Sequence, residues 1–262
     1  MIDRRRHRLG QIFLINRDIA GIEAEHGRGK RVLEIGPGPG MLTEELCRVA
    51  KRVVAVEKDR ALYADLKMRL ASKKLTLMNK DFFDASDDEL MAEDTDIVIA
   101  NVPYSLSSKI VGWLAEHRMQ AVLCLQKEFV DHMMAKPDTS DYSRLSVVTA
   151  LSFRVTRIYE VARGSFRPVP KVDSTIIYMK PLGQRITPEE SRIIGAIMQH
   201  KKKRLKNAIS DSEGQLGLSK SEAVTIAGAL DDANARVFKL TPDRLLAIAR
   251  TIAVHSNEND SS

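Results

Sequence analysis

Apolar residues in the first two thirds of the chain occur as short, nearly continuous runs that are rich in β-branched side chains. Such runs are expected for strands buried on both faces of a parallel sheet. The strands predicted in this way are residues 31–35, 53–57, 75–79, 96–100 and 120–126. Segments at 41–49 and 61–71 lie between them and predict helices. This alternation indicates a doubly wound α/β domain.

The pattern changes towards the end of the chain. Further strands are predicted at 145–155 and 174–179, with a proline-rich loop at 165–171 between them. From 188 to 254 the sequence predicts helices joined by short turns, without a strand signal. The expected division is an α/β domain at 1–184, a small all-helical domain at 185–255 and a polar, disordered tail at 256–262.

Composition narrows the class of protein. Of the 262 residues, 44% are hydrophobic and 29% are charged, which is an ordinary globular balance. A net charge of +6 favours a polyanionic partner without specifying one. Cys47 and Cys124 are far apart and form no zinc-binding spacing, so no metal site is predicted. Without a disulfide framework, a signal peptide or a membrane-spanning run, we expect a cytoplasmic protein that does not enter a membrane.

A glycine-rich loop follows the first predicted strand and precedes a helix. Gly36, Gly38 and Gly40 let the backbone approach a ligand without a clashing Cβ atom. A dinucleotide fingerprint would place its third glycine at position 41, which is Met41. The spacing found here suits S-adenosylmethionine, which has no pyrophosphate. The alternative interpretation is a tight turn without a ligand.

Two carboxylates follow the next strands. Glu57 ends the second strand, where a carboxylate can accept hydrogen bonds from both ribose hydroxyls. Asp81 follows the third strand and precedes Phe82, so it can accept from an adenine amino group while an apolar neighbour packs on the base. The alternatives are a solvated strand end for Glu57 and a helix cap for Asp81.

The run Asn101-Val102-Pro103-Tyr104 ends the fourth predicted strand. The N6 lone pair of adenine is delocalised into the ring, which makes this nitrogen a poor nucleophile. The Asn101 side-chain oxygen and the Pro103 carbonyl can accept from its N–H groups and draw it towards tetrahedral geometry. Tyr104 supplies a stacking face for the base. A proline turn with a capping asparagine is the structural alternative.

With these motifs the chain resembles the ribosomal RNA adenine dimethylase family over almost its whole length. The resemblance implies a Rossmann-like S-adenosyl-L-methionine-dependent methyltransferase domain followed by a helical domain. It also implies dimethylation of two adjacent adenosines near the 3′ end of small-subunit rRNA, on a small ribosomal subunit precursor. We expect the protein to be a monomer. The matching segments are 9–14, 34–38, 101–104, 125–128, 142–147, 165–166 with Pro168, and 170–174.

Carried over by position, the resemblance implies two sets of site residues. Those of the cofactor site are Ile12, Leu14, Gly36, Gly38, Glu57, Asp81 and Asn101. Those that hold the target base are Asn101, Pro103, Tyr104 and, stacking on its opposite face, Phe166.

The chain departs from the family pattern at three places. Ile12 replaces a common asparagine, so a cofactor contact there must be apolar or through the backbone. Ser143 replaces a glycine, which indicates that the turn needs no positive φ. Lys201-Lys202-Lys203 replaces Arg-Arg-Lys, which keeps the attraction to phosphate but loses the bidentate fork.

Basic residues predict the RNA-binding surface. A charge run is usually a solvated face, but beside a base-handling site phosphate contact is the favoured interpretation. With few aromatic residues nearby, this surface is expected to position RNA without reading its sequence. The candidates are Arg4, Arg5, Arg6 and Arg8 at the start, and Lys201, Lys202, Lys203, Arg204 and Lys206 at the beginning of a helix or along it.

Two alternatives stay open at this point. A large-subunit rRNA dimethylase or an adenine DNA methylase would share the chemistry, but the DNA enzymes tend to carry Pro-Pro where Val102-Pro103 stands. The segments 142–147 and 170–174 argue against the large-subunit enzymes. A non-catalytic ribosome-assembly factor or a transcription factor could use the same fold, although the intact 101–104 run favours catalysis.

Overall fold

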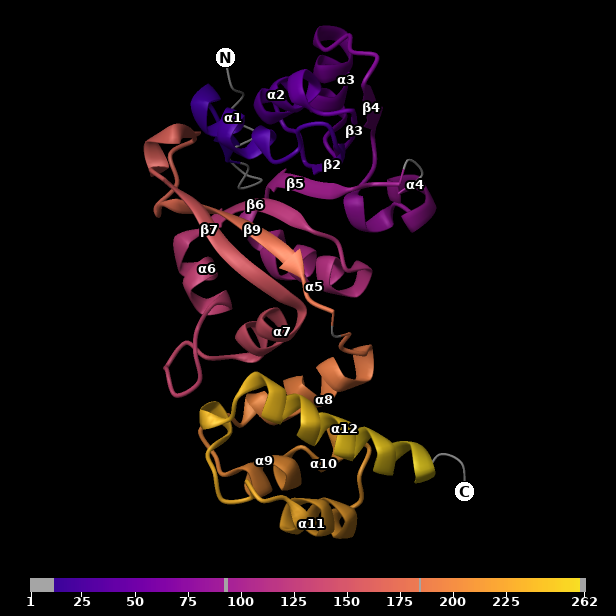
Figure 1. Cartoon of the computed structure of the whole chain (residues 1–262), viewed down its shortest axis with the longest axis vertical. Helices are drawn as coiled ribbons and strands as arrows, with labels where there is room; N and C mark the ends of the chain where they lie inside the picture. Colours follow the sequence, from indigo (N-terminus) through magenta and orange to yellow (C-terminus); the bar gives the residue numbers. More distant parts are fainter. Residues whose placement is uncertain (1–11, 92–93, 184, 260–262) are drawn as a thin grey trace. The chain divides into compact units, whose positions relative to one another are not determined.

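A computed structural model of the chain (Figure 1) divides by its internal contacts into two compact units. The first unit extends to Val130 and resumes over Val155–Pro181. The second consists of Asp131–Arg154 and the chain from Leu182 on. The residues described are 12–91, 94–183 and 185–259.

A seven-stranded sheet forms the centre of the first unit. Its strands are β2 (Arg31–Ile35), β3 (Arg52–Val56), β4 (Leu75–Met78), β5 (Ile97–Asn101), β6 (Ala121–Gln126), β7 (Phe153–Val161) and β9 (Ser174–Pro181). Their order is β4-β3-β2-β5-β6-β9-β7, in which β4, β3, β2, β5 and β6 are mutually parallel and β9 is antiparallel to β6. The chain reverses its direction of winding between β2 and β5, the point at which open α/β sheets bind ligands.

Helices cover both faces of this sheet (Figure 1). They are α1 (Arg17–Glu25), α2 (Met41–Val49), α3 (Arg60–Arg69), α4 (Asp87–Met91) and α5 (Ser107–His117). The helix α6 (Lys127–Met133) begins in the first unit and ends in the second. On one face, Ile19 of α1 and Leu46 of α2 pack in a core cluster with Val32 and Ile97 of the strands. The helix α5 lies on the opposite face. A short ribbon of β1 (Phe13–Leu14) and β8 (Phe166–Arg167), paired antiparallel, completes the unit.

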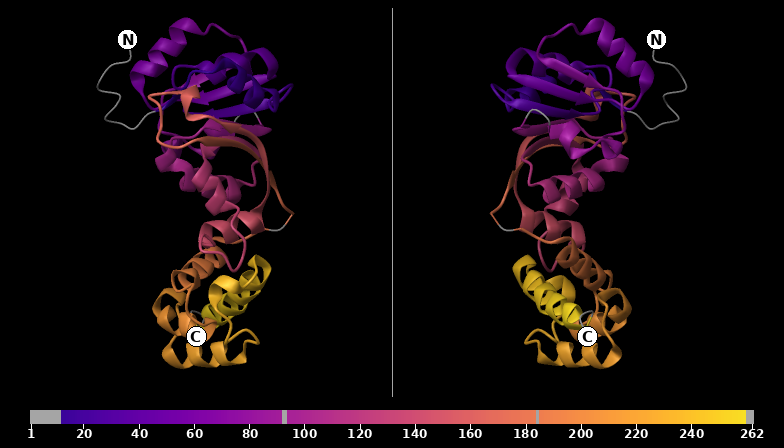
Figure 2. Two further views of the ribbon diagram at one scale, coloured as in Figure 1. Left: turned by 90° about the vertical axis from the view of Figure 1, so that its left-hand side faces the viewer. Right: turned by 90° about the vertical axis from the view of Figure 1, so that its right-hand side faces the viewer.

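The second unit is helical, as both views in Figure 2 show for its C-terminal part. Its helices are α7 (Arg144–Ser152), α8 (Pro188–Gln199), α9 (Leu205–Asp211), α10 (Glu213–Leu216), α11 (Lys220–Ala229) and α12 (Pro242–Asn259). A capping box starts α8, because Thr187 Oγ1 accepts from the Glu190 N–H and Glu190 Oε2 accepts from the Thr187 N–H. Buried side chains of α8, α9 and α12 form one core, among them Ile193, Leu205 and Leu245.

The strands predicted at 31–35, 53–57, 75–79, 96–100 and 120–126 are confirmed, each to within one residue at either end. Helices lie at both predicted positions between them. Near-continuous apolar runs bounded by polar turns were therefore sufficient to locate the parallel part of the sheet.

The strand predicted at 145–155 is wrong over most of its length, because α7 occupies Arg144–Ser152 and β7 begins only at Phe153. The Ser146 hydroxyl accepts from the Ser143 N–H and caps the helix. Val147 and Leu151, one helical turn apart, both enter the core of the second unit. This burial outweighs the β propensity of the segment. Ser143 itself has φ −150°, so the turn needs no glycine.

The unit boundaries differ from the expected division in one respect. Residues 131–154 belong by their contacts to the second unit, not to the α/β unit, since Tyr142 and α7 pack in its core. The Tyr142 hydroxyl also donates to the Leu240 carbonyl oxygen, at 3.0 Å. The tail expected from residue 256 overlaps the end of α12, and residues 260–262 lie outside those described.

Candidate active site

A cavity of 530 Å³ lies in the first unit at the carboxyl ends of β2, β3, β4 and β5. Its volume falls within the roughly 300–1,000 Å³ that small-molecule sites span. The wall contains every residue predicted for the cofactor: Ile12, Leu14, Gly36, Gly38, Glu57, Asp81 and Asn101. Residues that are far apart in the sequence therefore meet at the switch point of the sheet.

The glycine loop between β2 and α2 has a left-handed backbone. Gly38 has φ +57° and Gly40 has φ +93°, a region that favours glycine. A Cβ atom on Gly38 would lie 2.9 Å from Phe13 Cδ1, and one on Gly40 would clash with Leu66 Cδ2. The backbone conformation thus favours glycine, and the Phe13 and Leu66 side chains would have to shift to admit a Cβ atom.

Glu57 follows β3 and is only 5% exposed. Its Oε2 accepts from the Gly38 N–H at 3.0 Å, and its Oε1 accepts from the Asp59 N–H at 2.7 Å. Burial raises the pKa of this carboxyl, and the two backbone donors oppose the rise. Each oxygen keeps a further lone pair, so Glu57 can accept hydrogen bonds from a pair of hydroxyls. The alternative of a solvated strand end does not describe this buried side chain.

Asp81 lies in the same wall, and it is also a cap. Its Oδ1 accepts from the Phe83 N–H at 3.1 Å at the start of a short 3-10 helix, Phe82–Asp84. Its Oδ2 accepts from Lys58 Nζ at 2.6 Å, and this hydrogen bond is the main reason that the pKa of Asp81 is lowered. Phe82 is buried beside it and also lines the cavity. Asp81 therefore both caps the 3-10 helix and lines the cavity.

A second, small cavity of 20 Å³ adjoins the first. Ile12, Asn101 and Pro103 line both. The remaining wall of the small cavity consists of Val102, Tyr104, Cys124, Phe166 and Ser174. All four residues predicted to hold the target base are thereby brought together.

The Asn101 amide sits between the two cavities with its two ends in different surroundings. Its Nδ2 donates to Glu23 Oε2 at 3.1 Å. Its Oδ1 is buried and has no hydrogen-bond partner among the described residues. A buried acceptor without a partner is costly, so this atom marks where a donor would bind.

Pro103 and Tyr104 continue the chain beyond β5. The Pro103 carbonyl accepts from the Leu106 N–H at 2.8 Å, which leaves one lone pair for another donor. The Tyr104 hydroxyl and Ser174 Oγ, on β9, are 3.3 Å apart and form a hydrogen bond. This bond holds the Tyr104 ring in the wall of the small cavity.

Phe166 comes from β8, whose pairing aligns it with Leu14 of β1. It is 4% exposed. In this ribbon, β1 thus carries two residues of the cofactor cavity, Phe13 and Leu14, and β8 carries one residue of the small cavity. Stacking of Phe166 on a base stays a prediction.

Glu23 and Ser174 contact Asn101 and Tyr104, and neither contact was predicted from the sequence. A signal existed for Glu23, because it falls on the same face of α1 as Ile19, Ala20 and Ala24, all of which are buried. A carboxylate on an apolar helix face needs a partner, and here the partner is Asn101. Ser174 lies in the matching segment 170–174, but its contact with Tyr104 could not be predicted, since it depends on the pairing of β9 with β6.

The predicted RNA-binding lysines do not all have free side chains. Lys201 Nζ donates to the Ser140 and Tyr142 carbonyls, each at 2.8 Å, and Lys203 Nζ lies 2.6 Å from Asp211 Oδ2. The run forms the turn before α9, with Arg204 as the N-cap residue. Lys202, Arg204 and Lys206 are exposed, whereas Arg4, Arg5, Arg6 and Arg8 lie outside the described residues.

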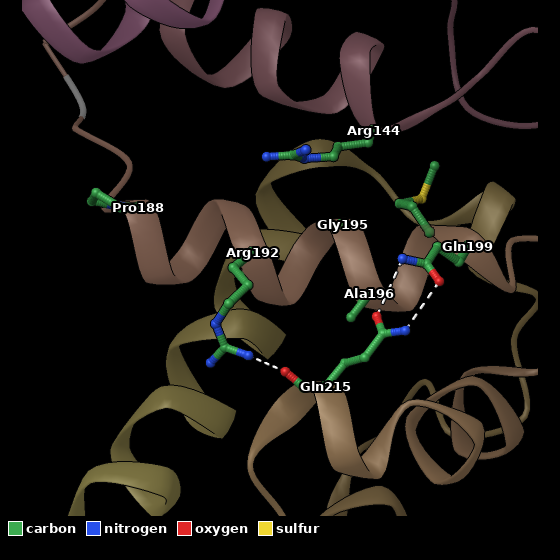
Figure 3. A pocket seen from close by; sticks show the side chains of 8 residues that line it. Arg144, Pro188, Arg192, Gly195, Ala196, Gln199 and Gln215 are labelled. Carbon is green, nitrogen blue, oxygen red and sulfur yellow. Dashed lines mark hydrogen bonds between the residues drawn. The ribbon is translucent and has the colours of Figure 1, made fainter.

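The second unit has a pocket of its own, of 450 Å³ (Figure 3). Its polar side chains bond within or beside its wall: Arg192 donates to the Gln215 carbonyl, and the amides of Gln199 and Gln215 exchange hydrogen bonds. Arg144 Nη2 donates to Ser191 Oγ at 3.0 Å. We assign no ligand to this pocket.

Over the described residues, no group of three His, Cys, Asp or Glu side chains is placed to hold a metal ion, and no helix is long and apolar enough to cross a membrane. Cys47 and Cys124 are free thiols, and Cys124 is buried.

Comparison with known proteins identifies the family. A family model described as ribosomal RNA adenine dimethylase matches residues 2–251. A relative from Thermococcus sibiricus, named probable ribosomal RNA small subunit methyltransferase A, is 36% identical over 242 residues, covering 89% of this chain and 86% of its own. A relative of the same name from Pyrococcus furiosus is 33% identical over 258 residues, covering 95% and 92%.

Two solved structures of methyltransferases also resemble this chain over most of its length. A dimethyladenosine transferase from Plasmodium falciparum aligns with a TM-score of 0.80 and 27% identity, over 92% of this chain and 98% of that one. The 23S rRNA methyltransferase ErmE aligns with a TM-score of 0.63 and 26% identity, over 92% and 99%. With a family match over nearly the whole chain and the predicted residues gathered at one edge of the sheet, the chain belongs to the ribosomal RNA adenine dimethylase family of S-adenosylmethionine-dependent methyltransferases.

Proposed function

We propose that the protein transfers methyl groups from S-adenosyl-L-methionine to N6 of two adjacent adenosines near the 3′ end of small-subunit rRNA, during ribosome biogenesis. The observation that carries this proposal is the buried Asn101 Oδ1, which has no partner among the described residues and lies where the two cavities meet. An acceptor at that point suits an exocyclic amine that must be held beside the cofactor.

The residues of the larger cavity fit S-adenosylmethionine. Glu57 offers lone pairs to the two ribose hydroxyls and Asp81 offers them to the adenine amino group. Gly36 and Gly38 line the cavity without a side chain. When bound there, the molecule supplies an electrophilic methyl group on a positively charged sulfur that is already a good leaving group.

The residues of the smaller cavity prepare the nucleophile. Asn101 Oδ1 and the free lone pair of the Pro103 carbonyl accept from the two N6–H groups and draw the nitrogen towards tetrahedral geometry. The lone pair of N6 then points away from the ring and can attack the methyl carbon. The N–C bond would form as the C–S bond breaks, the C–S electron pair would stay on the departing sulfur, and one N6 proton would pass to solvent. Tyr104 and Phe166 stack on the two faces of the base.

The target base must leave its stack to reach this cavity. A space of 20 Å³ holds about one water molecule, so the side chains that line it must separate to admit adenine. Tyr104 and Phe166 are the residues we expect to move.

Tyr104→Phe tests the separate roles of the ring and its hydroxyl. The variant keeps the stacking face and loses only the bond to Ser174, so we expect no more than a few-fold fall in methylation rate. Single-turnover assays at saturating cofactor measure this. A loss as large as that of Tyr104→Ala would show that the hydroxyl, and not the ring, matters.

RNA contact is part of the proposal. We propose that Lys202, Arg204 and Lys206, together with Arg4, Arg5, Arg6 and Arg8, bind phosphates of a small-subunit precursor, and that the protein acts as a cytoplasmic monomer. Lys201 and Lys203 contribute less, since their side chains are held by carbonyls and by Asp211.

Replacing Lys202, Arg204 and Lys206 with Gln should weaken RNA binding and flatten its dependence on salt, because fewer counterions are released. Each lost phosphate contact reduces the slope of log K against log salt by about 0.9 for duplex and about 0.7 for single strands. Filter binding at several salt concentrations measures the slope.

The matched control replaces the exposed Lys51, Lys67 and Lys73 of the first unit with Gln, which removes the same charge elsewhere. Equal slopes in the two triple variants would mean that Lys202, Arg204 and Lys206 only form a solvated surface and do not contact phosphates of the RNA.

The decisive experiment incubates undermodified small subunits with labelled S-adenosylmethionine and maps the labelled base. Large subunits and adenine-containing DNA are run in parallel. Label on two adjacent small-subunit adenosines supports the proposal. Label on large subunits or on DNA would instead identify a large-subunit rRNA dimethylase or an adenine DNA methylase. A chain that binds small subunits but methylates nothing would be an assembly factor.

A further inference from the structure

The Asn101 amide can act on the target amine only if its oxygen, and not its nitrogen, faces the substrate. The two ends of an amide have nearly the same shape, so packing alone does not distinguish them. A hydrogen-bond partner on the far side decides the orientation. In this protein that partner lies on α1, outside every motif of the active site.

Glu23 supplies it from the apolar face of α1. Its side chain is 0% exposed and lies among Ile19, Ala20 and Ala24, which pack against the sheet. Its Oε2 accepts from Asn101 Nδ2 at 3.1 Å. Its Oε1 is buried without a partner among the described residues, so the Asn101 bond is the one that compensates the carboxyl.

From this geometry we infer that Glu23 is the positioning residue of the reaction: it binds the NH₂ end of Asn101 and so turns Oδ1 towards the substrate amine. The inference rests on the proposed function for the identity of that amine. The pairing also accounts for a buried carboxyl in a helix that otherwise contributes apolar side chains to the core.

Charge is not needed for this role. Burial raises the pKa of Glu23 to about 8, with the neighbouring Glu34 adding to the rise and the Asn101 hydrogen bond lowering it. Glu34 on β2 is itself buried, and the Cys124 thiol on β6 also interacts electrostatically with Glu23. A neutral carboxyl still accepts through its carbonyl oxygen, so both protonation states can hold the amide.

The test compares two substitutions of similar size. Glu23→Gln keeps an acceptor for Asn101 Nδ2, so we expect at least half of the wild-type kcat. Glu23→Leu removes the acceptor but keeps the volume and the apolar packing, so we expect kcat to fall at least about tenfold while the Kd for S-adenosylmethionine changes less than twofold. A Leu variant that is folded and as active as wild type would overturn the inference.

A double-mutant cycle excludes a merely structural role. If Glu23 acts through Asn101, adding Glu23→Leu to Asn101→Ala should not lower kcat further, since the two side chains work as one unit. Independent, additive losses would contradict positioning. Thermal unfolding of each variant checks that the fold is retained.

One measurement needs no substitution at position 23. The Asn101 side-chain amide protons of the wild-type protein should exchange slowly with solvent, and their NMR signal is assigned by its absence in Asn101→Ala. Rapid exchange would overturn the pairing even if Glu23→Leu does not fold. Failure of wild type to methylate any adenosine would instead remove the proposed function, so the two failures are distinguishable.

Discussion

Asn101→Ala is expected to lower the rate of adenine methylation by about 10²–10³-fold at saturating cofactor. It removes one of two acceptors that hold the target amine, and loss of one such preorganised partner typically costs this much. The Pro103 carbonyl and most of the wall remain. Single-turnover assays with undermodified small subunits measure the loss.

Binding to the subunit should survive this substitution, because phosphate contacts carry most of the affinity. Asn101 also lines the cofactor cavity, so cofactor affinity has to be measured alongside. Asn234→Ala, in an exposed turn of the second unit, is the matched control. A rate near wild type for Asn101→Ala would remove the two-acceptor mechanism.

Glu57→Ala should weaken S-adenosylmethionine binding by roughly 1.5–3 kcal/mol, the range for hydrogen bonds to a charged group. The ribose hydroxyls lose their acceptor, and the Gly38 N–H that shapes the glycine loop loses its partner. Isothermal titration calorimetry measures the affinity. The same titration with NAD should show no binding, since Met41 occupies the place of the dinucleotide glycine.

The control for this substitution is Glu25→Ala, which removes an exposed carboxylate that pairs with Arg28. Its cofactor affinity should match wild type. If Glu57→Ala stays folded and binds S-adenosylmethionine as tightly as the control does, Glu57 is not a cofactor ligand. Thermal unfolding separates this outcome from a collapse of the loop.

The local sequence was enough to predict the parallel strands of the sheet and the site residues that follow them. The β3 and β5 runs are apolar at four of their five positions, as expected for strands that are covered on both faces. Because parallel strands end at a common edge, Gly38, Glu57 and Asn101 could be placed together before any contact was known. Each of these signals lies in a few consecutive residues.

At two other places the local sequence led to a wrong or incomplete prediction. The segment that became α7 is rich in residues that favour strands, and only the core that Val147 and Leu151 enter makes it helical. Lys201 belongs to a basic run, yet its ammonium group is held by two backbone carbonyls from a distant loop. Propensity and charge are properties of the residue, whereas burial and pairing depend on what the fold brings near it.

The sequence by itself determined the strand–helix order, the need for glycine between β2 and α2, and the polar residues at the strand ends, since each depends on backbone geometry over a few neighbours. Only the tertiary structure decided which way the Asn101 amide faces. That depends on Glu23, which lies 78 residues away along the chain and 3.1 Å away in space. A hydrogen bond between such distant residues leaves no periodicity in the sequence, and only the packing of α1 against the sheet creates it.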